Sequence, residues 1–208
     1  MSRPIAILHL DESCLGNGRE GENPGGGGGL IEARTRTGRI ERRDFYLSEP
    51  ATTNNRMALR GATMALDLLA RKGVRVSALM VSDSQYLVKG MREWVPGWKG
   101  RGWARKGGPI ENLALWKALD AASRKHDVQW VWLRGHQLHP KNEYADWLAV
   151  RAAKEQRATD GAVRSEFNEW LAARQAKGLY AGYDPDAGFA GLEQRVAEDE
   201  EFPLVLVE

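Results

Sequence analysis

Residues 4–12, PIAILHLDE, decide the fold, because they read as a strand that is buried on both of its faces. Successive side chains of an extended chain point to opposite faces. One face carries Ile5, Ile7, His9 and Asp11, and the other carries Ala6, Leu8, Leu10 and Glu12. Apolar residues on both faces predict a strand inside a covered sheet, which delivers an aspartate at its end.

The segments after this strand predict a hairpin and then a helix. A glycine-rich stretch, GNGREGENPGGGGG, leads to a second strand at residues 30–36, and Thr37-Gly38 turns into a third strand at residues 39–47. For most of the glycine run, a flexible loop is the simplest interpretation. A helical stripe of alanines and leucines then begins near Asn54 and closes at Gly73.

The second half alternates between helix and strand. An apolar strand at residues 74–81 is followed by Asp83, a short helix from Ser84 to Trp94 and a basic loop rich in glycine and tryptophan. A helix at residues 109–125, a strand at 128–133 and a helix at 142–155 complete the pattern. This order predicts an α/β domain with a mixed five-stranded sheet and helices packed on it.

Residues 157–208 form a C-terminal extension with a helix and an acidic tail, beyond a domain that we place at residues 1–156. We expect an amphipathic helix at residues 162–177, a segment rich in glycine, tyrosine and aspartate, and a solvated acidic stretch. The apolar end, residues 202–207, is expected to add a strand or to dock on the domain.

Composition restricts the cellular setting. No apolar run of the 208 residues approaches the roughly 20 that a membrane helix needs, and residues 1–10 lack the basic start and cleavage site of a signal peptide. The single cysteine, Cys14, cannot form an internal disulfide. We therefore expect a cytoplasmic monomer without a membrane partner.

Asp11, Asp83, Asp146 and His136 each lie at the end of a different predicted element. In α/β sheets, groups at strand ends and helix starts converge in one crevice. Carboxylates that are gathered from distant parts of a chain indicate a divalent-metal site more strongly than a solvated surface, because Mg²⁺ prefers hard oxygen ligands.

Six segments occur in the order and spacing of one known family. They are DESCLGN, TTNNRMAL, SDSQYLVKGMREW, WKGRGW, NLALWKALD and WVWLRGHQLHPKNEYADWLA. Together they resemble type 1 ribonuclease H from about Ile5 to Glu155. The resemblance implies the ribonuclease H-like fold, with helices on both faces of the sheet, and hydrolysis of the RNA strand of an RNA/DNA hybrid duplex.

The resemblance also implies the catalytic machinery. Asp11, Asp83 and Asp146 would hold two Mg²⁺ ions, with Mn²⁺ as a possible substitute, for two-metal hydrolysis of a phosphodiester. His136 matches a mobile histidine of the family that is thought to shuttle protons or to assist product release. Taken alone, a loop histidine such as His136 is more often a solvated residue.

Ala58 is the departure from this pattern. The family motif ends in TTNNRMEL, with a metal-binding glutamate where this chain has alanine. Three explanations stay open: a substitution introduced to disable the enzyme, a natural change with another ligand or water completing the site, and an inactive protein that only binds hybrids. Glu12 is the candidate replacement, although strand alternation places it on the face opposite Asp11.

The resemblance implies a hybrid-binding surface as well. Residues expected to read the minor groove, where 2′-hydroxyls mark the RNA strand, are Asn17, Asn54, Asn55 and Gln85. Thr53 matches a residue that binds a DNA phosphate. The expected basic protrusion includes Trp94, Trp98, Lys99, Arg101 and Trp103. Helix capping by the asparagines and packing by Trp94 and Trp98 are the alternatives. A DNA nuclease of the transposase or resolvase class is disfavoured, because TTNN and the basic tryptophan loop resemble hybrid recognition.

Overall fold

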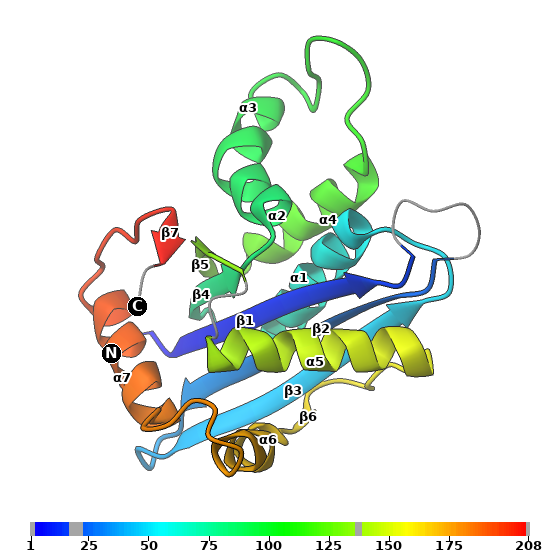
Figure 1. Ribbon diagram of the computed structural model, residues 1–208. Coiled ribbons are helices and arrows are strands. Elements are labelled where there is room, and N and C mark those ends of the chain that lie inside the picture. The colour runs from blue at the N-terminus through cyan, green and yellow to red at the C-terminus, as the bar shows by residue number, and fades with distance from the viewer. Residues whose placement is uncertain (1–2, 17–22, 136–138, 207–208) are drawn as a thin grey trace.

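The computed structural model describes residues 3–16, 23–135 and 139–206. A mixed seven-stranded sheet forms its centre (Figure 1). The strands are β1 (Ile5–Cys14), β2 (Gly25–Arg34), β3 (Ile40–Glu49), β4 (Ser77–Ser82), β5 (Asp127–Leu133), β6 (Val163–Arg164) and β7 (Val205–Leu206). Their order across the sheet is β6-β3-β2-β1-β4-β5-β7. The five expected strands are all present, and the extension supplies the two additional ones, β6 and β7.

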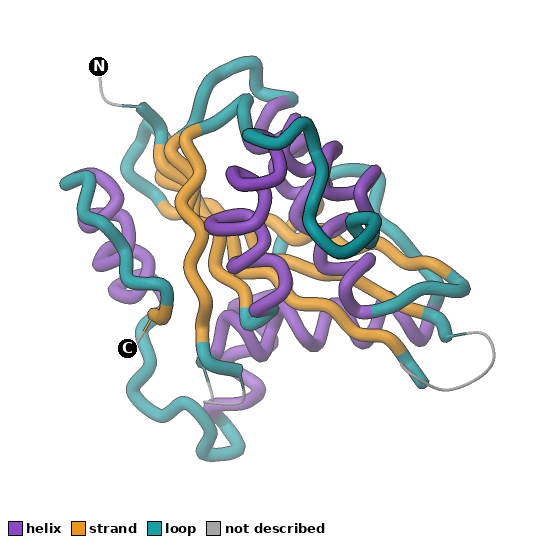
Figure 2. The backbone as a smooth tube through the Cα atoms, turned by 90° about the horizontal axis from the view of Figure 1, so that it is seen from above, coloured by secondary structure: helices purple, strands orange, loops and turns teal. Residues whose placement is uncertain are grey.

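Helices cover both faces of the sheet, as expected (Figure 2). They are α1 (Asn54–Ala70), α2 (Gln85–Lys89), α3 (Val95–Lys99), α4 (Leu113–Ser123), α5 (Pro140–Glu155), α6 (Phe167–Gln175) and α7 (Pro185–Ala197). A π-helical turn, Gly90–Trp94, connects α2 to α3. Leu8 and Leu10 of β1 pack with α1 in one buried cluster, whereas Ile7 packs with α7 in another. Because side chains alternate between the two faces of β1, this strand contributes to two hydrophobic clusters.

The glycine run belongs to β2, so the flexible-loop interpretation was wrong for Gly25 to Gly29. These residues pair with both β1 and β3. A Cβ atom on Gly26 would lie 2.1 Å from the carbonyl oxygen of Ala149, and one on Gly28 would lie 2.7 Å from its backbone nitrogen. Glycine is required here because α5 packs directly on the backbone of β2, and this close approach brings the helix that carries Asp146 onto the sheet.

The C-terminal extension pairs with both outer strands of the central sheet. β6 is antiparallel to β3, and β7 is parallel to β5. The helix expected at residues 162–177 is confirmed in shorter form as α6, and the apolar end adds a strand as expected. The helix α7 was not expected, although Asp184 caps it through bonds from two backbone N–H groups. Among the described residues, no helix is long and apolar enough to cross a membrane.

Candidate active site

Acidic side chains from three parts of the chain meet in one cavity where β1 and β4 stop pairing. β1 and β4 are parallel neighbours, so Asp11 and Glu12 at the end of β1 lie beside Asp83, which follows β4. Asp146 comes from α5. These side chains share a cavity of about 260 Å³ with Asn54, Ser84, Asn142 and Glu143. The structure thus brings together the three aspartates predicted from the sequence and adds Glu12 to them.

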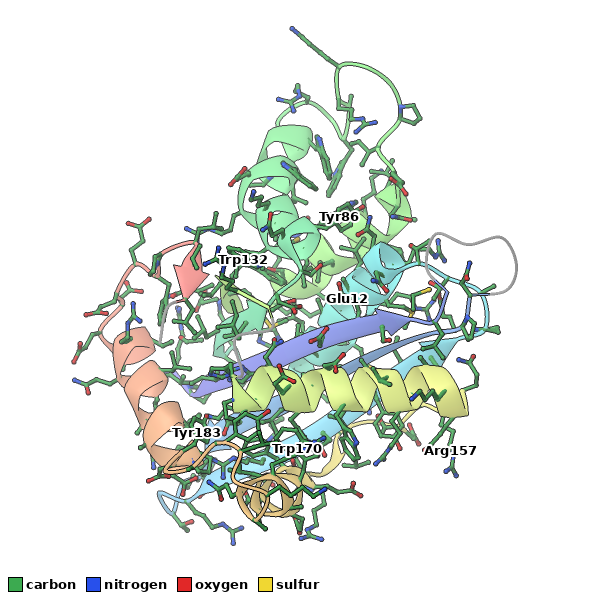
Figure 3. The ribbon with its side chains drawn as sticks, viewed as in Figure 1. Glu12, Tyr86, Trp132, Arg157, Trp170 and Tyr183 are labelled. Atoms are coloured by element: carbon green, nitrogen blue, oxygen red, sulfur yellow. The ribbon has the colours of Figure 1, made fainter. Side chains whose placement is uncertain are left out.

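Glu12 lies within reach of the aspartates despite pointing to the other face of β1. One carboxylate oxygen from each of Asp11, Glu12 and Asp83 lies within 4.8 Å of the others. The pairing of β1 with β4 stops at Leu10 and Ser82, so Asp11 and Glu12 flank the point at which Asp83 leaves the sheet between β4 and α2. Figure 3 shows Glu12 on the later half of β1, a central strand of the sheet. Strand alternation therefore does not exclude Glu12 from the acidic cluster.

Ala58 lies on the side of the sheet toward which Glu12 points. Its side chain is buried in the same cluster as Leu8 and Leu10, the residues of β1 that share a face with Glu12. A glutamate at position 58 and the glutamate at position 12 would approach the site from the same side. The packing interpretation of Ala58 is confirmed, because its side chain is buried within this hydrophobic cluster.

The cluster is electrostatically strained because like charges are held close together. Burial, followed by the negative charges of Asp83, Glu12 and Asp146, raises the pKa of Asp11 well above its ordinary range. Burial and Asp83 raise the pKa of Glu12 to about 8, opposed by a hydrogen bond from Ser84. Carboxyls that repel one another in this way bind a divalent cation readily, because the cation removes the repulsion.

Polar contacts that the sequence did not reveal fix two of the aspartates. The Asn142 side-chain amide donates to Asp11 Oδ2 at 3.2 Å. The Trp132 indole donates to the backbone carbonyl oxygen of Asp83 at 2.8 Å. Asn142 lies one helical turn before Asp146, and that spacing could have identified it. Nothing in the sequence marks Trp132, because its role depends on the pairing of β4 with β5.

A glycine brings the loop before α5 close to the cluster. A Cβ atom on Gly135 would lie 2.7 Å from Asp83 Oδ2. The chain therefore passes Asp83 at a distance that only glycine permits. His136, the predicted catalytic histidine, follows directly and lies outside the described residues, as does Asn17 of the predicted minor-groove set.

The RNase H family model matches residues 4–154 of this chain. The chain belongs to the ribonuclease H family. It is 45% identical over 157 residues to the ribonuclease H of Aromatoleum aromaticum, covering 75% of this chain and 95% of that protein. It is 43% identical to ribonuclease HI of Caulobacter vibrioides, over 73% of this chain and 95% of that one.

A solved structure extends the similarity over the full length. The crystal structure of LC9-RNase H1, described as a type 1 RNase H with the type 2 active-site motif, has a TM-score of 0.80 and 43% sequence identity. The match covers 100% of this chain and 98% of LC9-RNase H1, so it includes the C-terminal extension. The expected family and fold are confirmed.

Around the cavity of this ribonuclease H lie several of the predicted hybrid-binding residues. Thr53 caps α1, and its hydroxyl accepts from the Arg56 backbone N–H at 3.4 Å. Asn54 lines the cavity, and its buried Oδ1 has no hydrogen-bond partner among the described residues. Asn55 follows in α1, and Gln85 is exposed at the start of α2. The capping role thus falls to Thr53, which leaves the Asn54 amide oxygen without a structural partner.

The basic protrusion, residues 86–108, rises above the sheet in Figure 1. Trp98 is only 8% exposed and packs against Trp116 at 5.7 Å between ring centroids, which favours the packing alternative for this residue. Trp94 and Trp103 are half-buried, and Arg101 is exposed. Lys99 pairs with Asp120 at 2.8 Å. The aromatic residues thus support the protrusion, Lys99 is held by an ion pair, and Arg101, Arg105 and Lys106 are exposed to solvent.

Proposed function

We propose that this chain is an endoribonuclease that hydrolyses the RNA strand of RNA/DNA hybrids, with Glu12 supplying the carboxylate that Ala58 lacks. The observation that carries the proposal is the convergence of Asp11, Glu12 and Asp83, whose carboxylate oxygens lie within 4.8 Å of one another. The similarity to LC9-RNase H1, whose active-site motif is described as that of another ribonuclease H type, supports an altered but functional ligand set.

The donor set fits Mg²⁺ or Mn²⁺, because it consists of hard carboxylate oxygens that repel one another without a cation. Asp11, Glu12, Asp83 and Asp146 would hold two ions when the hybrid is bound. Such ions activate an attacking water and stabilise the leaving oxygen. The protein's own residues orient the donors: Asn142 holds the Asp11 carboxylate, and Trp132 holds the backbone of Asp83. His136 is proposed to transfer protons during the reaction.

The cavity and its surroundings suit a hybrid duplex. Asn54, Asn55 and Gln85 offer amide groups that can bond to 2′-hydroxyls, and Thr53 and the exposed basic residues of the protrusion would contact phosphates. A purely hybrid-binding protein is not favoured, because such a role needs no cluster of repelling carboxylates. The free Cys14 fits a reducing compartment, and we propose a monomer in the cytoplasm.

Cleavage of a labelled RNA/DNA duplex in Mg²⁺ and in Mn²⁺ tests this function. The wild-type protein is expected to cut, and Asp83→Asn and Glu12→Gln are each expected to lose about 100-fold or more of kcat, since each removes a charged donor from the site. Adding Ala58→Glu to Glu12→Gln restores part of the activity, because both carboxylates approach from the same side of the sheet.

Each variant tests a different explanation of the altered site. Full activity in Glu12→Gln would show that Glu12 is not a ligand. A silent wild-type protein that Ala58→Glu alone activates would be a disabled enzyme. A protein that binds the hybrid but cuts in no variant would refute the nuclease assignment.

A further inference from the structure

A buried lysine connects the C-terminal extension to the helix that carries Asp146. Lys141, in the first turn of α5, is 1% exposed. Its Nζ lies 2.7 Å from Oε2 of Glu32, which is fully buried, and donates to the Pro185 carbonyl oxygen at 3.2 Å. A buried ammonium at a helix start is costly, because it loses its hydration and faces the positive end of the helix dipole. These partners offset that cost.

The extension closes this network. Pro185 is the first residue of α7, so a single ammonium holds the starts of α5 and α7 together. Arg42 of β3 bonds to Glu32 Oε1 at 2.8 Å and to Asp186 of α7 at 2.7 Å. Glu32 and Asp186 are thus joined through Arg42, and the sheet, α5 and α7 meet at one ionic centre.

The same turn of α5 reaches the active site. Lys141 is followed directly by Asn142, whose amide bonds to Asp11, and Asp146 lies one turn further along. His139 caps α5 by accepting from the Asn142 backbone N–H at 3.4 Å. The Tyr183 ring of the extension contacts the His139 ring edge-on, with centroids 6.5 Å apart. Figure 3 shows Tyr183 between α7 and α6, beside this junction.

We propose that Lys141 is a positioning residue through which the C-terminal extension fixes the first turn of α5 and so aligns Asn142 and Asp146 for metal binding. This inference rests on the proposed function, since it assigns Asp146 and Asp11 to the metal site. Lys141 does not line the acidic cavity; it acts through the helix start that it holds between Glu32 and Pro185.

Binding of Mn²⁺ alone to the full-length protein tests the proposal, with free Mn²⁺ followed by electron paramagnetic resonance. Lys141→Met keeps a long apolar chain and removes the ammonium. We expect it to raise the Kd for Mn²⁺ about 10-fold, as is typical when an outer-shell partner is lost. It should lower kcat while leaving hybrid affinity in EDTA unchanged, a split that simple loss of stability would not produce.

Glu193→Gln is the matched control. Glu193 also joins α7 to the sheet, through Arg34 at 2.7 Å, but that pair does not involve α5. Its Kd for Mn²⁺ should stay within about twofold of the wild-type value. Equal weakening in both variants, or an unchanged Kd in Lys141→Met, would overturn the positioning role.

A second variant keeps the test decisive if Lys141→Met fails to fold. Lys141→Met/Glu32→Gln removes both members of the pair and leaves Arg42 with Asp186, and it should show the same 10-fold loss of Mn²⁺ affinity. An unchanged affinity in the folded double variant would also overturn the role. If the wild-type protein binds Mn²⁺ and does not cut hybrids, the nuclease proposal fails while the Lys141 test still gives a result.

Discussion

The protein contains two groups of acids, the partly exposed acids of the active site and the buried network of Glu32, which differ in the charges that surround them. At the active site, burial and the negative charges of neighbouring acids raise the pKa of Asp11 and that of Glu12. Glu32, by contrast, is paired with Arg42 and Lys141. His9 lies nearby, but burial lowers its pKa and keeps it neutral, so the two longer side chains supply the positive charge.

This difference separates a structural acid from the acids of the candidate active site. Glu32 has cations built into the fold, and the network that it forms holds helices to the sheet. The active-site acids repel one another within the part of the chain that the structure describes, and an external cation would remove that repulsion. Repulsion among the active-site acids thus destabilises the folded protein locally, whereas the ion pairs of Glu32 stabilise the contacts of the helices with the sheet.

Removing the structural acid gives the largest expected effect on stability. Glu32→Gln leaves Lys141 and Arg42 buried with less compensation, and we expect it to lower the free energy of unfolding by about 3 kcal/mol. Urea denaturation measures this. The half-exposed pair of Arg34 and Glu193 provides the comparison, because Glu193→Gln should cost less than about 1 kcal/mol. Equal losses would mean that the Glu32 network is no more important than a surface ion pair.

Metal binding should change the free energy of unfolding somewhat less, and we expect it to act on the active-site acids. Mg²⁺ at roughly 100 times its Kd should stabilise the folded protein by about 2.7 kcal/mol. Thermal unfolding with Mg²⁺ and with EDTA measures the difference. Glu12→Gln should reduce this gain, because it removes one donor, whereas Glu193→Gln should preserve it. A full Mg²⁺ gain in Glu12→Gln would remove Glu12 from the ligand set.

The convergence of the three aspartates could be predicted from the sequence, because the information needed is local. Asp11 and Asp83 each follow an apolar strand, and parallel pairing of those strands is enough to bring them together. Glu12 was harder to place, because alternation gives the face to which a side chain points but not how far the side chain reaches beside a neighbouring loop. The contact from Trp132 to Asp83 could not be predicted, since it depends on the register between β4 and β5.

The extension was harder to interpret than the domain before it. In α7, Phe189, Leu192 and Val196 share a helical face, and Asp184-Pro185 marks its start, so the helix was detectable in principle. Its docking site was not detectable, because Lys141 and Glu32 are far apart in sequence and neither looks apolar. A core is recognised in a sequence by its apolar residues, so buried ion pairs of this kind are not detected.

The smallest expected effect is the pH dependence of the metal-free protein. The unfolded chain releases the Glu12 proton near pH 4.5, whereas the folded chain retains it up to about pH 8. Between these values the unfolded state binds fewer protons, so the free energy of unfolding should fall as the pH rises. The cavity is open to solvent, and we expect a fall on the order of 1 kcal/mol. Urea denaturation in EDTA at several pH values measures it.

Glu12→Gln isolates this contribution, because glutamine cannot titrate. Subtracting its pH profile from that of the wild-type protein should leave a component that declines between about pH 4.5 and pH 8. Saturating Mg²⁺ should abolish the decline, since a bound cation favours the ionised carboxylate. Glu32→Gln should leave the component in place, because Glu32 belongs to the other group of acids. A difference between wild type and Glu12→Gln that does not change with pH would show that Glu12 ionises as freely in the folded protein as in water. The contrast between the active-site acids and Glu32 would then rest on Asp11 and Asp83 alone.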